Sequence, residues 1–309
     1  MDNSAMTDPQ PDFRPSPLIP ERIAPGLRRI LAPNASPMTY RGTNTYLLGT
    51  SDIAVIDPGP DDPSQQAAIL GALEPSQRIS TILVTHAHLD HSPLARRLSE
   101  ATGAPVLAFG DAESGRAPDM ARLADAATVG GGEGVDISFR PDRTLGEGES
   151  LEGDGWRLTA MHLPGHFGNH MGFAWGDALF SGDLVMGWAT SLVSPPDGDL
   201  TAFMASLRRL QAHRWSVFYP AHGAPVTSPG DRLAELVAHR EAREAAILAA
   251  LESGPASAIG LATRIYTETP APLLSAARRN VLAHLIDLQR RSCVGIDEPL
   301  SEASVAWLT

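Results

Sequence analysis

Three histidines and one aspartate fall within six residues of the sequence, in the segment Thr85-His86-Ala87-His88-Leu89-Asp90-His91. The segment directly follows residues 79–84, a β-branched apolar run typical of a strand that is buried on both faces. Imidazole and carboxylate groups are ligands that suit zinc, iron and manganese. Because side chains alternate along an extended chain, His86 and His88 share one side, whereas Asp90 and His91 continue into the next turn. The segment therefore predicts ligands for two neighbouring metal ions.

Two complete metal sites need more ligands than this segment supplies, and suitable residues occur downstream. Each follows an apolar run and stands beside glycine or proline, as a ligand on a turn after a strand would. They are His166 in Leu163-Pro164-Gly165-His166, Asp183 in Ser181-Gly182-Asp183, and His222 in Pro220-Ala221-His222-Gly223. We therefore predict these metal ligands: His86, His88 and His166 for a first ion, Asp90, His91 and His222 for a second, and Asp183 as the bridge between them.

Such a pair of ions predicts hydrolysis. Two divalent cations roughly 3.5 to 4 Å apart share a hydroxide whose pKa falls toward neutrality, so the site needs no serine or cysteine nucleophile. The ions would polarise a carbonyl or phosphoryl oxygen and stabilise its negative charge. Asp90 would act as the catalytic carboxylate that steers the hydroxide or relays a proton. The expected cofactors are thus two divalent metal ions, with zinc preferred and manganese or iron as alternatives.

The composition narrows the function further. The chain has 309 residues and a net charge of −12, and it contains no lysine. A Schiff-base lysine and the phosphate-binding lysine of a P-loop are therefore excluded, and broad attraction to nucleic acid or to an anionic membrane is disfavoured. Cys293 is the only cysteine, so an internal disulfide and a cysteine-rich metal site are excluded. A small molecule is the expected substrate, and self-association into a homo-oligomer stays open.

The sequence contains no apolar run of the length that a membrane helix needs. Its first twenty residues hold five prolines and lack both a positive start and an apolar stretch, which is unlike a secretory signal. We therefore expect a cytoplasmic protein with a loose N-terminal arm over residues 1–20.

Short apolar segments separated by turn signals indicate the elements that position the ligands. Residues 62–73 and 95–102 have the apolar spacing of helices. A hairpin and further strands are expected over residues 45–48, 53–56, 79–84, 105–108, 136–139, 156–163, 171–175 and 178–181. Strands with helices inserted between them predict an α/β fold, with sheets layered with helices, over residues 21–225.

The composition changes near residue 226, after which helical patterns dominate. Two extended pieces close the chain over residues 293–296 and 304–308. Amphipathic helices are expected over residues 231–251, 255–266 and 272–290. Residues 226–309 therefore predict a second, mainly helical domain, which we expect to cover the site or to mediate self-association.

The ligand pattern resembles that of the metallo-β-lactamase superfamily, in which a His-x-His-x-Asp-His motif precedes separate His, Asp and His ligands. The match runs from about Tyr40 to Pro225 and implies an αββα sandwich with a two-metal site at one edge of its paired sheets. Phe167 and the pair Ser92-Pro93 depart from residues common in the family and change the rim of the site. Within the superfamily, the chain resembles the branch named for β-lactamase-like protein 2 in residues 41–46, 56–59 and 180–185. Members of that branch carry a winged-helix-like C-terminal domain.

Several activities stay open at this stage. An ester, thioester, lactone or phosphodiester hydrolase needs only the two metals and a pocket. The resemblance adds a single-stranded RNA endonuclease, which the net charge disfavours, and an iron-dependent oxidoreductase, which the ligand types allow. A metal-stabilised binding protein without turnover is a further alternative, although no ligand position is lost. β-Lactamase activity is disfavoured because no export signal is expected.

Other residues near these motifs have both functional and structural interpretations. His170 would contact a ligand or substrate, or serve as a hydrogen-bonded structural residue. Asp57 would orient the first motif or shape a turn. His162 is interpreted as structural, whereas Phe167 and Trp188 would line a pocket or pack in the core. Surface positions are expected for His213, His239, His284 and the arginine pairs 278/279 and 290/291.

Overall fold

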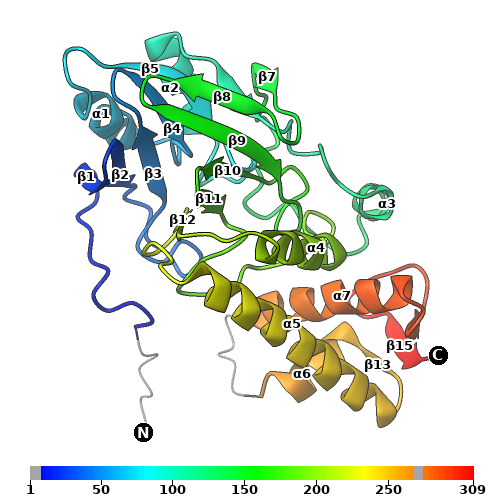
Figure 1. Cartoon of the computed structure of the whole chain (residues 1–309). Coiled ribbons are helices and arrows are strands. Elements are labelled where there is room, and N and C mark those ends of the chain that lie inside the picture. The colour runs from blue at the N-terminus through cyan, green and yellow to red at the C-terminus, as the bar shows by residue number, and fades with distance from the viewer. Residues whose placement is uncertain (1–7, 268–273) are drawn as a thin grey trace, which may run out of the picture.

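Two β-sheets pack face to face in the first two thirds of the chain (Figure 1). The computed structural model describes residues 8–267 and 274–309. Within them, the first sheet has the strand order β1 Glu21–Ala24, β2 Leu27–Leu31, β3 Asn44–Leu48, β4 Asp52–Ile56, β5 Arg78–Leu83, β6 Val106–Ala108 and β7 Arg143–Thr144. The second sheet has the order β12 Val217–Pro220, β11 Ala178–Gly182, β10 Met171–Trp175, β9 Trp156–His162 and β8 Ser150–Gly153.

The two sheets meet through the alternate side chains of their strands. In β3, Tyr46 and Leu48 belong to the apolar cluster between the sheets, while Leu47 belongs to the cluster on the outer face. Phe173 of β10 and Phe180 of β11 approach from the second sheet, and the rings of Tyr46 and Phe180 lie 5.1 Å apart. The alternation fixes the strand register, because a slip by one residue would turn every buried side chain to the other face.

Helices cover the outer face of each sheet. α1 Pro63–Gly71 and α2 Leu94–Thr102 pack on the first sheet, and Asp62 caps α1 by accepting hydrogen bonds from its first backbone N–H groups. α4 Leu200–Gln211 and the first half of α5 Pro229–Glu252 pack on the second sheet. The order helix, sheet, sheet, helix confirms the expected αββα sandwich.

The end of the chain forms a mainly helical part beside the sandwich (Figure 1). α3 Pro118–Ala126 of the sandwich packs into the same apolar cluster as these C-terminal helices. The C-terminal elements are the second half of α5, α6 Ala258–Ile265, α7 Leu274–Arg290 and a small antiparallel sheet of β13 Ala256–Ser257, β15 Val305–Leu308 and β14 Val294–Ile296. Helices combined with a small antiparallel sheet agree with the winged-helix-like domain that the resemblance implied.

α5 joins the two parts of the molecule. Its Leu233 and Leu236 belong to the apolar cluster of the second sheet, whereas Ile247 and Leu251 belong to the cluster of the C-terminal helices. The expected domain limits, which include a division near residue 226, therefore stay predictions.

The longer elements lie within a few residues of their expected positions. These are the hairpin of β3 and β4, the strands β5, β6, β9, β10, β11, β14 and β15, and the helices α1, α2, α5, α6 and α7. The start of the last helix, expected at residue 272, lies outside the described residues. No sequence pattern above predicts α3, α4, β1, β2, β8 or β12.

The strand expected over residues 136–139 is wrong, because this segment forms a turn. Asp136 Oδ1 accepts a hydrogen bond from the backbone N–H of Ser138 at 3.1 Å, and Asp136 Oδ2 accepts one from the hydroxyl of Ser92 at 2.8 Å. Ile137, which suggested a strand, is 77% exposed. An aspartate that bonds the backbone two residues on favours a turn over a strand.

The N-terminal arm is attached rather than loose over its described residues, 8–20. The carboxylate of Asp8 pairs with Arg41 at 2.6 Å. The side chain of Gln10 accepts a hydrogen bond from the backbone N–H of Ala224 at 2.9 Å. The prolines of the arm exclude regular structure, but these side-chain contacts still hold it against the sandwich.

Two arginines of α7 bind the sandwich instead of solvent. Arg290 pairs with Asp119 and with Asp199, each at 2.7 Å, and so joins α7 to the ends of α3 and α4. Arg279 is only 8% exposed. The surface position expected for Arg279 is therefore wrong.

His284 is buried, which corrects the surface position expected from the sequence. It lies on α7 with 1% of its surface exposed, and neither ring nitrogen has a hydrogen-bond partner among the described residues. Burial, together with the positive charges of Arg240 and Arg243, lowers the pKa of His284 to about 3. His213 and His239 are exposed, as expected.

Replacing His284 by leucine is expected to make the protein more resistant to acid. The unfolded chain binds a proton near pH 6.5 and the folded chain only near pH 3, so stability is lost as the pH falls between these values. Two pH units below the ordinary pKa, the loss approaches about 2 to 3 kcal/mol. Urea unfolding near neutral pH and in that acidic window measures it for wild type, His284→Leu and the exposed control His239→Leu. An equal acid-induced loss in all three proteins would contradict the prediction.

Candidate metal centre

The predicted ligands come together at one end of the two sheets, on loops that follow four strands. β5 leads into residues 86–91, β9 into His166, β11 into Asp183 and β12 into His222. Because β11 and β12 are adjacent and parallel, their carboxyl ends place Asp183 and His222 close together. Ligand atoms lie within 4.8 Å of one another in each of three groups: His86, His88 and His166; His86, His91 and Asp183; Asp90, His91 and His222.

His86, His88 and His166 form the first cluster. Nε2 of His86 lies 2.9 Å from Nδ1 of His88, and Nε2 of His166 lies 3.2 Å from the same atom. The ring of His88 stands nearly edge to face against the other two, at 76° and 78°. Three ring nitrogens therefore converge. A proton on one of them cannot form hydrogen bonds to both of the others.

Asp90, His91 and His222 form the second cluster. Oδ2 of Asp90 lies 3.3 Å from Nε2 of His91 and 3.1 Å from Nε2 of His222. The two imidazole rings are nearly perpendicular, at 78°, with their centroids 5.3 Å apart. Both Nε2 atoms thus face the same carboxylate.

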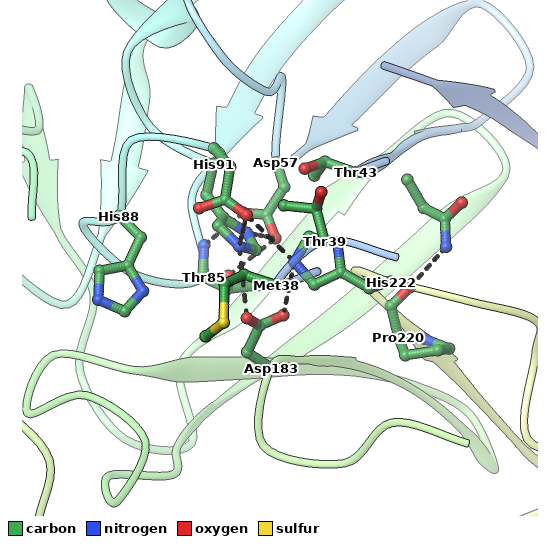
Figure 2. Close-up of polar contacts among 12 residues, drawn as sticks. Met38, Thr39, Thr43, Asp57, Thr85, His88, His91, Asp183, Pro220 and His222 are labelled. Atoms are coloured by element: carbon green, nitrogen blue, oxygen red, sulfur yellow. Dashed lines mark hydrogen bonds and ion pairs between the residues drawn. The ribbon is translucent and has the colours of Figure 1, made fainter. Parts of the chain in front are cut away.

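Asp183 stands between the two clusters. Its Oδ1 lies 3.3 Å from Nε2 of His222, and its Oδ2 lies 3.7 Å from Nε2 of both His91 and His166. Figure 2 shows the Asp183 carboxylate directed at His91 and His222. One carboxylate therefore reaches a member of each cluster, as a bridging ligand must.

Four of the imidazole rings are held through Nδ1, which leaves Nε2 directed at the clusters. The Nδ1 partners are the Thr85 hydroxyl for His86 at 3.0 Å, the Asp57 carboxylate for His91 at 3.0 Å, the Leu192 carbonyl for His166 at 2.8 Å and the Gly42 carbonyl for His222 at 3.1 Å. A carbonyl or carboxylate acceptor fixes the proton on Nδ1, so Nε2 presents a lone pair. This arrangement is typical of metal-binding histidines.

Several buried atoms of the centre lack hydrogen bonds that would otherwise stabilise them. Nε2 of His91, Nε2 of His222 and Oδ1 of Asp183 have no hydrogen-bond partner within the described part of the chain. Buried polar atoms without partners are costly, and a cation coordinated by them removes that cost. Groups of imidazole and carboxylate donors fit divalent zinc, iron or manganese.

The two clusters differ in charge. Burial lowers the pKa of all three histidines of the first cluster, that of His88 to about 3, which favours a neutral cluster. Burial also disfavours the charged form of His222, but the carboxylates of Asp183 and Asp90 outweigh it and raise the pKa of His222 to about 10. Without a metal, the second cluster thus pairs carboxylates with protonated imidazole, and a bound cation would replace those protons.

Asp57 orients the first motif, which is the first of its two interpretations. Its carboxylate accepts hydrogen bonds from the backbone N–H of Thr85 at 2.7 Å and from the Thr85 hydroxyl at 2.8 Å, and it faces Nδ1 of His91. The φ of Asp57 is 49°, in the left-handed region that suits a tight turn. The side chain therefore fixes the start of the ligand loop and the orientation of one ligand.

Two buried asparagines hold the ligand loops, and no sequence argument above assigned them a role. Asn169 accepts a hydrogen bond from the backbone N–H of Ala87 at 3.3 Å. Asn44 donates to the carbonyl oxygens of Pro220 and Gly223, at 3.0 and 2.9 Å, in the loop that carries the last ligand. Only their position in the sequence could have pointed to these two residues. Asn169 directly precedes a histidine, and Asn44 lies in a strand-like motif.

His170 supports the bridging position. Its Nε2 accepts a hydrogen bond from the backbone N–H of Asp183 at 3.1 Å, so this hydrogen-bonded histidine contacts a predicted ligand residue. Gly182 has φ +51°, and a Cβ at this position would lie 2.5 Å from Nε2 of His170. Glycine is therefore required for the turn that delivers Asp183.

The aromatic pocket candidates pack instead of lining the cavity. Phe167 is fully buried against the rings of the first cluster. Trp188 stacks on Tyr40 with ring centroids 4.9 Å apart. His162 stacks on Phe109 at 3.7 Å, which agrees with its structural interpretation.

A cavity of about 790 Å³ lies beside the clusters and is walled by both parts of the chain. Its metal side is lined by His88, Asp90, His166 and Asp183. Apolar walls come from residues that include Met38, Leu89, Val129 and Leu192, and the C-terminal part supplies Ser275, Ala276, Arg279 and Glu302. The C-terminal part therefore forms part of the cavity wall, as expected of a domain that covers the site, whereas self-association stays a prediction.

The connecting loop 191–195 holds two ligand positions on one side. The hydroxyl of Ser191 donates to the carbonyl oxygen of Asp183. The carbonyl oxygen of Leu192 faces Nδ1 of His166. This loop therefore fixes both the bridging residue and a member of the first cluster.

Two arginines of the C-terminal helices hold the same loop from the other side. Arg240 of α5 donates to the carbonyl oxygen of Ser191. Arg279 of α7 donates to the hydroxyl of Ser194 at 2.9 Å and to the carbonyl oxygen of Pro195 at 2.7 Å. The C-terminal helices thus contact the metal centre through one short segment.

This centre, on this fold, agrees with comparison of the sequence to known families. The metallo-β-lactamase superfamily profile matches residues 38–222, which include every predicted ligand. The chain belongs to the metallo-β-lactamase superfamily. The profile of the β-lactamase-associated winged helix domain matches residues 257–294, within the C-terminal part. The chain is accordingly a metal-dependent hydrolase of a superfamily that binds divalent metals.

Two curated relatives are similar over most of the chain. The β-lactamase-like protein 2 homolog of Drosophila melanogaster is 31% identical over 293 residues, which cover 91% of this chain and 94% of the relative. The atrochrysone carboxyl ACP thioesterase AgnL7 of Paecilomyces divaricatus is 34% identical over 239 residues, which cover 75% of this chain. The match spans only 66% of that thioesterase's own length.

A solved structure supports the arrangement of the whole chain. The β-lactamase domain protein from Burkholderia ambifaria superposes with a TM-score of 0.80, covering 97% of this chain and 96% of that one. At 22% sequence identity, this match shows only that the two chains share a fold. Of the helices described here, none has the length and apolar character needed to cross a membrane.

Proposed function

We propose that the chain is a binuclear hydrolase of a small-molecule thioester, with two zinc ions as the expected cofactors. The position of Asp183 between the two ligand clusters carries the binuclear part of this proposal. Esters, lactones and phosphodiesters are the other substrates that such a site admits.

The ligand assignment follows the clusters. The first cation would be held by His86, His88 and His166, and the second by Asp90, His91 and His222. Asp183 would be a ligand of both cations. Bound there, the cations supply a water that ionises near neutral pH and an electrophile for the acyl oxygen.

Asp90 has a second role, because its side chain is 25% exposed and lines the cavity. In thioester hydrolysis a water oxygen bonds to the acyl carbon, the carbon–sulfur bond breaks and the water gives up a proton. Asp90 orients that water and takes up the proton. The sulfur leaves with the electron pair of the broken bond.

The cavity lining favours a leaving group that departs without protonation. The described lining holds no lysine, tyrosine or cysteine, and its histidines, His88 and His166, belong to the first cluster. A thiol with a pKa near 8.5 leaves readily as the thiolate, whereas an alkoxide needs a proton donor. The relative named as a thioesterase supports the same substrate class.

Single-stranded RNA is the second candidate, and the charges oppose it. Arg279 is the only arginine or lysine among the described lining residues, which also include Glu133, Asp197 and Glu302. The whole chain carries −12. Binding of a polyanion needs several cationic side chains along its path.

A substrate panel with metal-replete protein tests the proposal. We expect cleavage of S-phenyl thiopentanoate, slower cleavage of the oxygen ester phenyl pentanoate, and no cleavage of single-stranded RNA. His88→Ala should lower thioester turnover by at least about 100-fold, whereas His239→Ala, at an exposed position, should match wild type. RNA cleavage without thioester turnover would select the second candidate.

Metal analysis of protein purified without added metal separates the remaining alternatives. Zinc or manganese at two equivalents per chain agrees with the proposal, while stoichiometric iron with oxygen consumption indicates an oxidoreductase. Chelation should abolish turnover and added zinc should restore it, so turnover that survives complete removal of metal contradicts the mechanism. The cytoplasmic location and a homo-oligomeric state stay predictions.

A further inference from the structure

Arg279 brings a buried positive charge to the wall of the metal-site cavity. It is 8% exposed, lies on α7 of the winged-helix part, and is the only arginine or lysine that lines the cavity over the described residues. Other walls of the same cavity include the apolar side chains of Leu89, Val129 and Leu192. A charge beside such walls interacts more strongly with an opposite charge than it would in water.

The guanidinium of Arg279 is fixed by neutral acceptors. Nε donates to the hydroxyl of Ser194 at 2.9 Å, and Nη2 donates to the carbonyl oxygen of Pro195 at 2.7 Å. Nη1 makes no hydrogen bond within the described part of the chain and lies 3.5 Å from Oε1 of Glu302. Arginine has five N–H donors, so the side chain is oriented while donors on Nη1 stay available.

The same loop ties Arg279 to the metal centre. The carbonyl oxygen of Leu192 faces Nδ1 of His166, and two residues later Ser194 receives the Arg279 hydrogen bond. His166, Leu192, Ser194 and Arg279 all line the one cavity. A substrate whose acyl carbon lies at the metals therefore shares one cavity with Arg279.

We propose that Arg279 is a specificity-determining residue that binds a carboxylate at the far end of the substrate's acyl chain. This inference rests on the proposed function, because it assumes that the acyl group occupies the cavity. One guanidinium, already partly balanced by Glu302, matches one monoanion. Glu302 opposes that anion and moves aside when it binds.

Two thioesters of equal chain length test this carboxylate-binding subsite at Arg279. S-phenyl thiopentanoate ends in a methyl group, and S-phenyl monothioglutarate ends in a carboxylate. The measured quantity is the ratio of their KM values, glutarate over pentanoate, for wild type, Arg279→Gln, Glu302→Gln and the control Arg278→Gln. Arg278 is adjacent on α7 but does not line the cavity.

The subsite predicts opposite shifts for the two lining variants. Arg279→Gln should raise the ratio by about 10- to 100-fold, because a charge-assisted hydrogen bond to the carboxylate is lost. Glu302→Gln should lower the ratio by about threefold, because the competing carboxylate is removed. Arg278→Gln should leave it unchanged. A purely structural role for Arg279 would change both KM values alike and would overturn the proposal.

Two further measurements keep the outcome decisive. If Arg279→Gln loses its folded structure, an unchanged ratio in Glu302→Gln alone overturns the subsite. If wild type cleaves neither thioester, the proposed function fails, and calorimetric titration of metal-replete protein with pentanoate and glutarate still tests the subsite. Tighter binding of glutarate that is lost in Arg279→Gln or strengthened in Glu302→Gln supports it, and equal binding of the two acids overturns it.

Discussion

Replacing Asp183 by asparagine is expected to lower the metal content from two equivalents to about one and kcat/KM by more than about 100-fold. Its Oδ1 faces His222 and its Oδ2 faces His91 and His166, so this one carboxylate lies between members of both clusters. An asparagine carries no negative charge and offers one acceptor oxygen. The second cluster should lose its ion first, because the first keeps three histidines.

The matched control for this variant is Asp197→Asn. Asp197 is another buried carboxylate of the same cavity, but it pairs with Arg116 at 2.6 Å and bonds the backbone N–H of Gly132. Metal analysis and steady-state kinetics on both variants are the measurements. Two tightly bound ions in Asp183→Asn, with kcat/KM near that of wild type, would remove the bridging role.

Asp57→Asn is the second change with a large expected effect, although Asp57 is not a predicted ligand. Oδ1 of Asp57 accepts from the backbone N–H of Thr85, so the asparagine oxygen would keep that position. The amide N–H₂ would then face Nδ1 of His91 and donate to it. The His91 proton would move to Nε2, which removes the lone pair that faces the second cluster.

We therefore expect Asp57→Asn to fold and to lose about 10- to 100-fold in affinity for one metal, with a similar or larger loss of kcat/KM. Asp57→Ala separates this effect from simple loss of packing. It leaves buried donors of Thr85 and His91 without acceptors and should lower the free energy of unfolding by about 2 to 5 kcal/mol. Urea unfolding and metal titration give the two readouts. Normal metal affinity in Asp57→Asn would show that the Nδ1 contact does not set the tautomer.

The ligands were predictable because their signal is local. Each predicted metal ligand follows an apolar run, and for the ligands after β5, β9 and β11 both the residue type and the strand end are visible in the sequence. His222 was predicted from its place beside glycine after an apolar run, although its strand β12 was not. The longer elements were predictable for the same reason, since alternation and helical spacing reflect burial within one segment. The error at residues 136–139 is also local, because the Asp136 side chain bonds the backbone of Ser138 and overrides an apolar-looking run.

The features that stayed hidden depend on contacts between distant segments. His284 appears in a helix without obvious partners, yet packing of α5 and α7 buries it. Arg279 reads as a charged residue on a helix face, yet Ser194 and Pro195 of the connecting loop fix it in the wall of the cavity. Neither the helical period nor the net charge contains information about which surface a helix meets.

By itself, the sequence determined the donor chemistry, most of the strands that carry it and the family to which the chain belongs. Tertiary structure alone decided that Asp57 faces Nδ1 of His91 and that Arg279 lies in the wall of the cavity. It also supplied the distances that put Asp183, the bridge predicted from the sequence, between the clusters. The physical reason is range: propensity and periodicity act between near neighbours along the chain, whereas the position of a bridging carboxylate or a buried charge follows from how whole layers pack.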